Sequence, residues 1–181
     1  KQRPKVAVEY MVLMLKDVEK LVEKPTDVET ENFYQRFFTR FTEQVVADAN
    51  DPNSPMVTRQ KTYAEVADVI RRGLLQNKIN TKATEILGDA TELAEAGFEQ
   101  LDFDTAKSED FKKYAGNYVK AAEQTGEKHK INIHTGKTAL ITAQDIWNDE
   151  YLGALIIRGQ SQTPTRLTTI AFSIDELGVT K

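Results

Sequence analysis

Residues 81–101 read TKATEILGDATELAEAGFEQL, and this stretch decides which fold we expect for the chain. Its apolar residues recur at spacings of three and four, which is the period of one face of an α-helix. The members of this face are Ile86, Leu87, Ala90, Leu93, Ala94, Phe98 and Leu101. Because Thr81 is a residue type that caps helix N-termini, we predict one helix from Thr81 to about Leu101, with an apolar side for the core.

The same stretch is strongly acidic. Residues 83–106 contain seven carboxylates and no lysine or arginine. Two basic stretches flank them: residues 58–82 carry six basic and two acidic residues, and residues 107–137 carry seven basic and four acidic ones. The net charge of −4 hides this segregation, which can steer partners and set their register. On the predicted helix, four carboxylates form a stripe along one face, namely Glu85, Asp89, Glu92 and Glu99.

Periodic apolar residues predict further helices on both sides of this one. We expect them over Lys5–Glu23, from Asp27 or Thr30 to about Ala49, from Thr62 to Leu75, and over Ser108–Gln124. The second contains a stripe of aromatic residues, Phe33, Phe37 and Phe41, with Tyr34 and Phe38 beside them, which is typical of a helical core. Turn-forming residues predict a loop at Asn50–Pro55 and a helix break at Asn77–Asn80.

The sequence changes character near Gly126, where glycines become frequent and strand-like segments appear. We predict short strands at Lys130–His134, Leu152–Ile157 and Thr168–Ile174, the last from its clean alternation, and helical spacing between Ala139 and Trp147. The predicted fold is therefore mainly α: a helical bundle of about five helices with a small C-terminal α/β element. We expect a helical domain over residues 1–125 and the mixed element over 126–181, packed on it or forming a single domain with it.

Composition limits the class of protein. Of 181 residues, 40% are hydrophobic and 29% are charged, as in ordinary folded domains. Cysteine is absent, which excludes disulfides and thiolate chemistry. The most apolar run, Val6–Leu15, contains Glu9 and is far shorter than the ~20 residues that span a bilayer. We expect a soluble protein without a membrane span, cytoplasmic or part of a larger assembly; its start at Lys1 suits a processed protein or an excised domain.

One segment partly matches a phosphate-binding loop. Gly136-Lys137-Thr138 has the ending of a Walker loop, but the place of the first glycine in that motif is taken by Ile131. A β-branched residue does not readily adopt the positive φ angles that such a loop needs. His129 and His134 lie in the same segment, and their spacing does not form a local chelate in a strand or a helix. An enzyme or nucleotide binder centred on 129–138 is therefore our second alternative.

The sequence contains no motif that would predict a metal or cofactor site. The spacing of the carboxylates does not match an EF-hand loop, and neither a zinc-protease nor a di-iron motif occurs. We therefore predict no metal, no cofactor and no catalytic residue.

A nucleic-acid-associated module is the first alternative. It would use the basic segments 58–82 and 107–137, with Tyr114 and Tyr118 as stacking groups. The helix pair around the expected break resembles a helix-turn-helix in outline, but its second helix is the acidic one, which phosphates would repel.

The leading interpretation is binding without catalysis. We expect a structural or adaptor protein that engages a protein partner or itself, an acidic face meeting a basic one. The residues that we predict to bind partners are Glu85, Asp89, Glu92, Glu99, Arg71, Arg72, Lys112, Lys113, Lys128 and Lys130.

Overall fold

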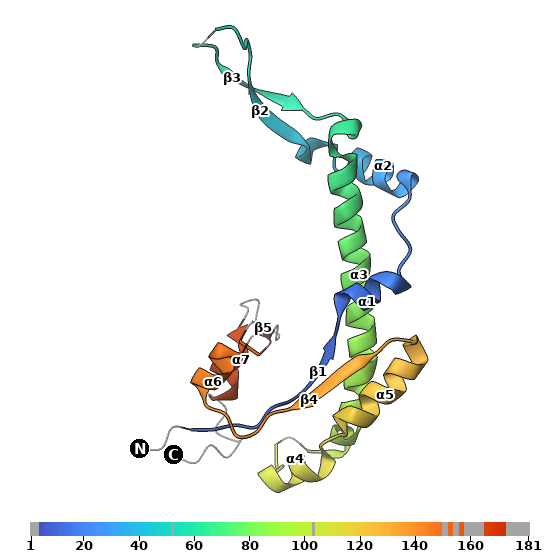
Figure 1. The fold of residues 1–181 in the computed structure, drawn as a ribbon, viewed down its shortest axis with the longest axis vertical. Coiled ribbons are helices and arrows are strands. Elements are labelled where there is room, and N and C mark those ends of the chain that lie inside the picture. Colours follow the sequence, from blue (N-terminus) through green and yellow to red (C-terminus); the bar gives the residue numbers. More distant parts are fainter. Residues whose placement is uncertain are drawn as a thin grey trace. The chain divides into compact units, whose positions relative to one another are not determined.

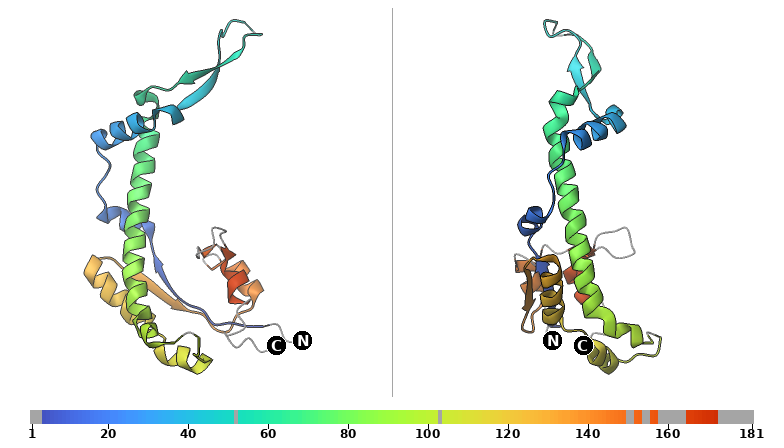
Figure 2. Two further views of the ribbon diagram at one scale, coloured as in Figure 1. Left: turned by 180° about the vertical axis from the view of Figure 1, so that it is seen from behind. Right: turned by 90° about the vertical axis from the view of Figure 1, so that its right-hand side faces the viewer.

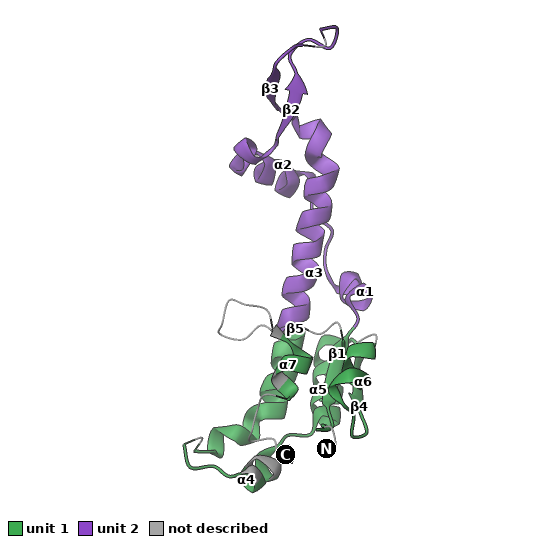
Figure 3. Cartoon of the chain, turned by 90° about the vertical axis from the view of Figure 1, so that its left-hand side faces the viewer, with its two compact units in different colours: residues 1–13, 86–181 green, residues 14–85 purple. Residues whose placement is uncertain are grey.

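The computed structural model describes residues 4–51, 53–102, 104–149, 152–153, 156–157 and 165–172 of the chain. The chain is divided into two compact units (Figure 3). One consists of Met14–Glu85, and the other consists of Lys1–Leu13 together with Ile86–Lys181. We call them the 14–85 unit and the terminal unit. The domain boundary predicted at residue 126 stays a prediction, and Gly126 itself lies within helix α5, Tyr118–His129.

Helix α3, Tyr63–Glu95, is the longest element and runs without interruption (Figure 1). The break predicted at Asn77–Asn80 is wrong. Asn77 and Asn80 each cost a helix up to ~0.7 kcal/mol relative to alanine, whereas burying Ile79 between them contributes ~1.5–3 kcal/mol. Ile79 is indeed buried, and the amide of Gln76 donates to Asn80 Oδ1 at 2.9 Å. Tertiary packing therefore outweighs the local signal.

The 14–85 unit begins with short helices. Helix α1, Leu15–Val18, continues into a 3-10 turn, Glu19–Leu21, and α2 spans Asp27–Arg36. A capping box starts α2, because Thr26 Oγ1 accepts from the Glu29 amide at 3.1 Å and Glu29 Oε2 accepts from the Thr26 amide at 2.7 Å. The rings of the predicted aromatic stripe do contact one another, with Phe33 and Phe37 ring centroids 4.6 Å apart and Tyr34 and Phe41 5.5 Å apart. The prediction that they form the core face of one helix is wrong, because α2 ends before Phe37 and the rings are half-buried or exposed.

The helix predicted to reach Ala49 instead ends at Arg36. After a 3-10 turn, Phe38–Arg40, the chain forms two antiparallel strands, β2 (Thr42–Val46) and β3 (Met56–Gln60), which we call the hairpin. Threonine and valine favour strands because their branched side chains suit a pleated surface. The predicted loop Asn50–Pro55 lies within the connection between the two strands.

The terminal unit is built on a second antiparallel pair, β1 (Glu9–Leu13) and β4 (Ile133–Lys137), which we call the ribbon. The helix predicted over Lys5–Glu23 is therefore wrong in its first half. Val6, Val8, Tyr10 and Val12 alternate with a period of two, and in so short an apolar run this period competes with the helical one. The strand predicted at Lys130–His134 does exist, shifted to Ile133–Lys137.

Further short elements complete this unit. They are a 3-10 helix at Ala96–Gln100, α4 (Ser108–Tyr114), α6 (Ala143–Asn148), the pair β5 (Ile156–Ile157) and β6 (Thr165–Arg166), and α7 (Leu167–Ala171). The strand predicted at Thr168–Ile174 is wrong where it is described, because α7 occupies its start. Ile146, Leu152 and Ala171 form a small core with Val6.

The predicted bundle of about five helices is likewise wrong. Helices dominate the described part of the chain, but most of them are short, and α3 is the only long helix among the described residues. The hairpin and the ribbon stand where long helices were expected, and the described strands pair into two-stranded sheets. The chain is better described as mainly α with one long helix and small β elements.

Candidate functional site

The carboxylate stripe of α3 is partly neutralised within the terminal unit. Asp89 Oδ2 lies 2.6 Å from Lys128 Nζ and 2.6 Å from His129 Nε2, both at the end of α5. These two partners, Lys128 first, hold the pKa of the Asp89 carboxyl below its usual value. Two residues predicted to bind a partner, Asp89 and Lys128, therefore meet each other.

The other carboxylates of the stripe differ in their surroundings. Glu85 accepts from Lys82 Nζ at 2.7 Å, one turn away on the same helix. Glu92 and Glu99 are exposed, Glu92 on α3 and Glu99 in the 3-10 helix that follows it. The stripe thus leaves solvent-facing negative charge at its C-terminal end.

The basic stretch 58–82 is mostly paired inside the 14–85 unit. Five of its six cations contact carboxylates: Arg59, Lys61, Arg71, Lys78 and Lys82. Arg71 donates to Asp27 at 2.7 Å and to Asp68 at 2.8 Å, and its bond to the Asp27 carboxylate is the main reason that the pKa of its guanidinium is raised. Arg72 is exposed. This pairing removes much of the positive potential that nucleic-acid binding by residues 58–82 would need.

The second basic stretch is distributed over α4 and α5. Lys113 Nζ lies 5.0 Å from the centre of the Tyr114 ring, and Lys112 belongs to α4 with a side chain outside the described part of the structure. Lys130 ends α5 in the left-handed conformation, with φ at 55°, where it turns the chain toward β4. Lys130 is exposed, so it remains available to a partner.

Sequence reasoning missed the hairpin, and its side chains have an unusual arrangement. The register pairs Val45 with Val57 on one face and Val46 with Met56 on the other. A two-stranded sheet that covers a core has one apolar and one polar face. Here both faces are apolar at the end next to the connecting loop, and exposed fractions reach 47% for Val46, 58% for Met56 and 42% for Val57. Within the 14–85 unit, no other described element covers this end (Figure 2).

The base of the hairpin, by contrast, is firmly held. Arg59 on β3 bonds both Glu43 on β2 and Glu65 in the first turn of α3, and Lys61 also pairs with Glu43 at 3.1 Å. The Arg59 bonds are the main reason that the pKa of Glu65 falls to about 2. Tyr34 donates its hydroxyl to the Lys61 carbonyl at 2.6 Å. The network orients the hairpin without contacting its apolar end.

The loop of the hairpin has its own order. Asp48 and Asp51 accept from the Asn50 and Asn53 amides, each at 2.9 Å, and Ser54 Oγ accepts from the Asp48 amide at 2.7 Å. These local bonds are typical of Asx turns. The hairpin therefore presents an apolar band beneath an acidic, locally bonded loop.

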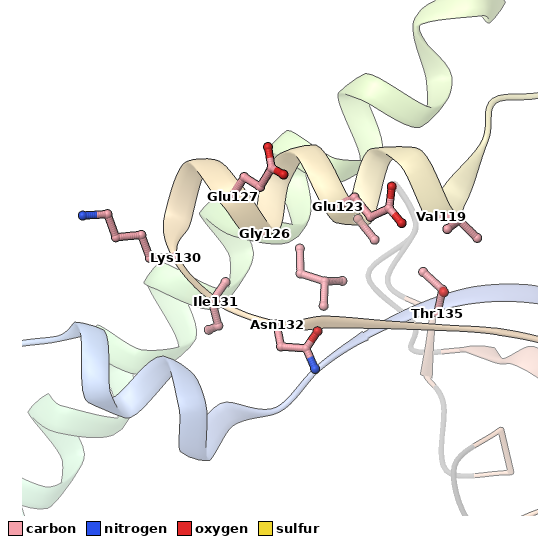
Figure 4. A pocket seen from close by; sticks show the side chains of 10 residues that line it. Val119, Glu123, Gly126, Glu127, Lys130, Ile131, Asn132 and Thr135 are labelled. Carbon is pink, nitrogen blue, oxygen red and sulfur yellow. The ribbon is translucent and has the colours of Figure 1, made fainter.

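The terminal unit holds two adjoining hollows between α5 and β4, of about 620 and 550 Å³. Both are lined by Val119 and Thr135, so together they follow the length of β4, and we call them the β4 groove. Figure 4 shows the first, with Glu123 and Glu127 projecting from α5 above the strand. In the second hollow, burial is the main cause that raises the pKa of Tyr118, followed by the charges of Glu95 and Glu9.

The segment 129–138 takes part in the ribbon. Gly136 lies beneath the Tyr10 ring, Lys137 pairs with Glu9, and Thr138 Oγ1 accepts from the Val8 amide at 3.0 Å. His134 lies 3.3 Å from the Asn132 amide, whereas His129 contacts Asp89. The Gly-Lys-Thr residues are thus extended and engaged in strand pairing, unlike a loop that wraps around a phosphate.

Comparison with protein-family models, with curated proteins and with solved structures finds no match for this chain. Among the described residues, no helix is both long and apolar enough to cross a membrane. The hairpin and the charged residues are therefore the features of this chain that bear on its function.

Proposed function

We propose that this chain is a non-enzymatic assembly protein that associates with other protein chains through its hairpin. The observation that supports this most is the pair of apolar contacts, Val45 with Val57 and Val46 with Met56, on opposite faces of a sheet with only two strands. An isolated two-stranded hairpin is marginally stable in water, and exposed apolar side chains gain free energy when a partner covers them.

Complementary charges would fix how the two associated chains are aligned with each other. Exposed acidic residues at the end of α3 and beyond it, Glu92 and Glu99, are the members of the carboxylate stripe best placed for a basic partner. Arg72, Lys113 and Lys130 are the corresponding exposed cations. Complementary charges of this kind speed association and select orientation more than they add affinity.

The test compares the parent chain with a variant that carries Met56→Gln and Val57→Thr. Both changes keep a strand-compatible shape while removing apolar surface from each face of the hairpin. Val28→Thr is the matched control, because Val28 is a singly exposed apolar residue of the same unit, 68% exposed on α2. We expect the hairpin variant to weaken association at least tenfold in sedimentation equilibrium, and the control to behave as the parent.

Two results would contradict the proposal. One is that the parent chain stays monomeric at every concentration and, in addition, retains the same proteins from an extract as the hairpin variant does. The other is a hairpin variant that associates as tightly as the parent.

A further inference from the structure

Two arginines of the 14–85 unit lie over the same aromatic ring. The guanidinium of Arg40 is 4.7 Å from the centre of the Phe37 ring, and that of Arg36 is 5.4 Å from it. Both arginines are exposed, whereas Phe37, which joins α2 to the 3-10 turn after it, is half-buried. Attraction between a cation and the face of an aromatic ring holds both guanidiniums close together. We call Arg36 and Arg40 the arginine pair.

The arginine pair differs from the two arginines of this unit that are bonded to carboxylates. Arg59 and Arg71 each bond two carboxylates. Within the described part of the chain, neither member of the arginine pair has a carboxylate within salt-bridge distance. The local sequence offers none, because residues 32–42 contain both arginines, five aromatic residues and no carboxylate. Two like charges therefore share one ring, and no described carboxylate neutralises them.

A guanidinium held in this way is prepared to bind a carboxylate. Its planar fork of N–H donors matches the two oxygens of a carboxylate, and its flat face can stay on the ring while its edge donates. Stacking also restricts the side chain in advance, so less conformational entropy is lost when a ligand binds. An acidic ligand would in addition reduce the repulsion between the two guanidiniums.

The backbone around the arginine pair favours carboxylates over a phosphate group. Phosphate sites commonly use free backbone amides as donors. Three amides here are already engaged: that of Phe37 donates to the Phe33 carbonyl at 3.1 Å, that of Arg40 to the Phe37 carbonyl at 2.9 Å, and that of Phe41 to the Phe38 carbonyl at 3.0 Å. The donors on offer are therefore mainly the two guanidinium forks, which suit two separate carboxylates.

An exposed aromatic side chain follows Phe37 in the chain. Phe38 is 44% exposed, and its ring packs edge-on against that of Tyr34, with centroids 5.5 Å apart. Arginine and aromatic residues are enriched in the buried centres of protein–protein interfaces. A protein segment that carries both carboxylates and apolar side chains can therefore contact the arginine pair and Phe38 together.

We propose that the arginine pair, held on Phe37, binds an acidic segment of a protein partner. This inference rests on the proposed function and names a second contact for the same partner, close in sequence to the start of β2. A second copy of the chain is one source of such a segment, because residues 91–105 carry five carboxylates, all exposed, and no lysine or arginine. Another acidic protein is the other source.

The test measures the binding of labelled peptides to the full chain by fluorescence anisotropy. One probe is the peptide of residues 91–105, the second is the same peptide with every carboxylate replaced by its amide, and the third is hexaglutamate. We expect the parent to bind a carboxylate probe at least tenfold more tightly than the amide peptide. Arg36→Gln with Arg40→Gln should weaken that binding at least tenfold.

Two further variants separate the guanidinium forks from simple charge. Arg72→Gln with Lys24→Gln removes the same charge from exposed positions of the same unit, and it should change the affinity less than twofold. Arg36→Lys with Arg40→Lys keeps the charge but loses the planar forks, and it should weaken binding at least threefold.

The probes also distinguish the two sources. Binding of the 91–105 peptide supports a second copy as the partner, and binding of hexaglutamate alone supports another acidic protein. The inference is overturned if the parent binds neither probe, if the lysine variant binds as tightly as the parent, or if the glutamine variant and its charge-matched control weaken binding equally. Displacement of the peptide by inorganic phosphate at a lower concentration than by acetate, at equal ionic strength, would overturn it as well.

Failure of this inference can be told from failure of the proposed function. If the arginine pair binds no acidic probe while Met56→Gln with Val57→Thr still weakens association, the inference falls and the proposed function stands. If the chain associates with no protein at all, both fall.

Discussion

The ribbon and the hairpin are both two-stranded antiparallel sheets of five-residue strands, yet only the ribbon is covered. On its α5 side, Leu13 and Ile133 are buried opposite each other, and on its other face the Tyr10 ring covers Gly136. The hairpin places apolar pairs on both faces at one end, and Val46, Met56 and Val57 of these pairs are exposed. The ribbon is therefore stabilised within its own unit, whereas the apolar end of the hairpin is left uncovered, and this is why we propose that another chain completes it.

The largest expected effect is a difference in unfolding free energy when one apolar side chain is shortened in each sheet. Ile133→Ala should lower the free energy of unfolding by about 2–5 kcal/mol, because Ile133 is 7% exposed and its removal leaves a cavity beneath α5. Val57→Ala, at the exposed end of the hairpin, should cost a dilute, unassociated chain under about 1 kcal/mol, since little buried surface is lost. Urea unfolding of both variants measures the difference. Equal costs would contradict the distinction between a covered and an uncovered sheet.

A smaller effect is expected where the ribbon is covered by a side chain. The Tyr10 ring occupies the space that a Cβ atom would need at Gly136. Gly136→Val should displace the ring and destabilise the unit by about 1–3 kcal/mol in urea unfolding.

The control for Gly136→Val is the same change in a chain that already carries Tyr10→Ala. There the penalty should largely vanish, because no ring remains to be displaced. A full penalty in that background would show that the backbone at Gly136, rather than its contact with Tyr10, forbids a side chain.

The sequence predicted features that depend on neighbouring residues, but it did not predict strand pairing between distant segments of the chain. The aromatic stripe and the turn residues at Asn50–Pro55 are local signals. The turn lies where it was predicted, and the aromatic rings contact one another, but they do not form the buried face of one helix. The strands beside that turn were missed, although the β-branched residues on both sides of it were the available signal. The ribbon joins β1 to β4 across most of the chain, and a periodicity measured within one short segment carries no information about such a partner.

The candidate site shows the same limit. Segregated charge along the chain predicted separate acidic and basic faces, but contacts such as Lys78 with Glu29 and Lys128 with Asp89 bring opposite charges together. Which charges remain exposed depends on which helices pack side by side, and that depends on buried residues such as Ile79 and Ile86. The sequence could therefore supply the candidate residues, whereas the fold decides which of them are available to a partner.

The smallest expected effect concerns the base of the hairpin and its dependence on pH. The pKa of Glu65 is lowered to about 2, chiefly by its bond with Arg59. A carboxylate with a depressed pKa in the folded state stabilises that state above its unfolded value of about 4.5, and this contribution disappears as the pH falls toward 2. The parent should therefore unfold at higher urea concentration than Glu65→Gln at pH 7, and the gap should close below pH 4.5.

Glu31→Gln, which removes an exposed carboxylate of α2, controls for the loss of one charge. A gap that stays constant from pH 7 to pH 2 would mean that Arg59 does not hold Glu65, and the hairpin would then lack the fixed base that distinguishes it from a flexible arm.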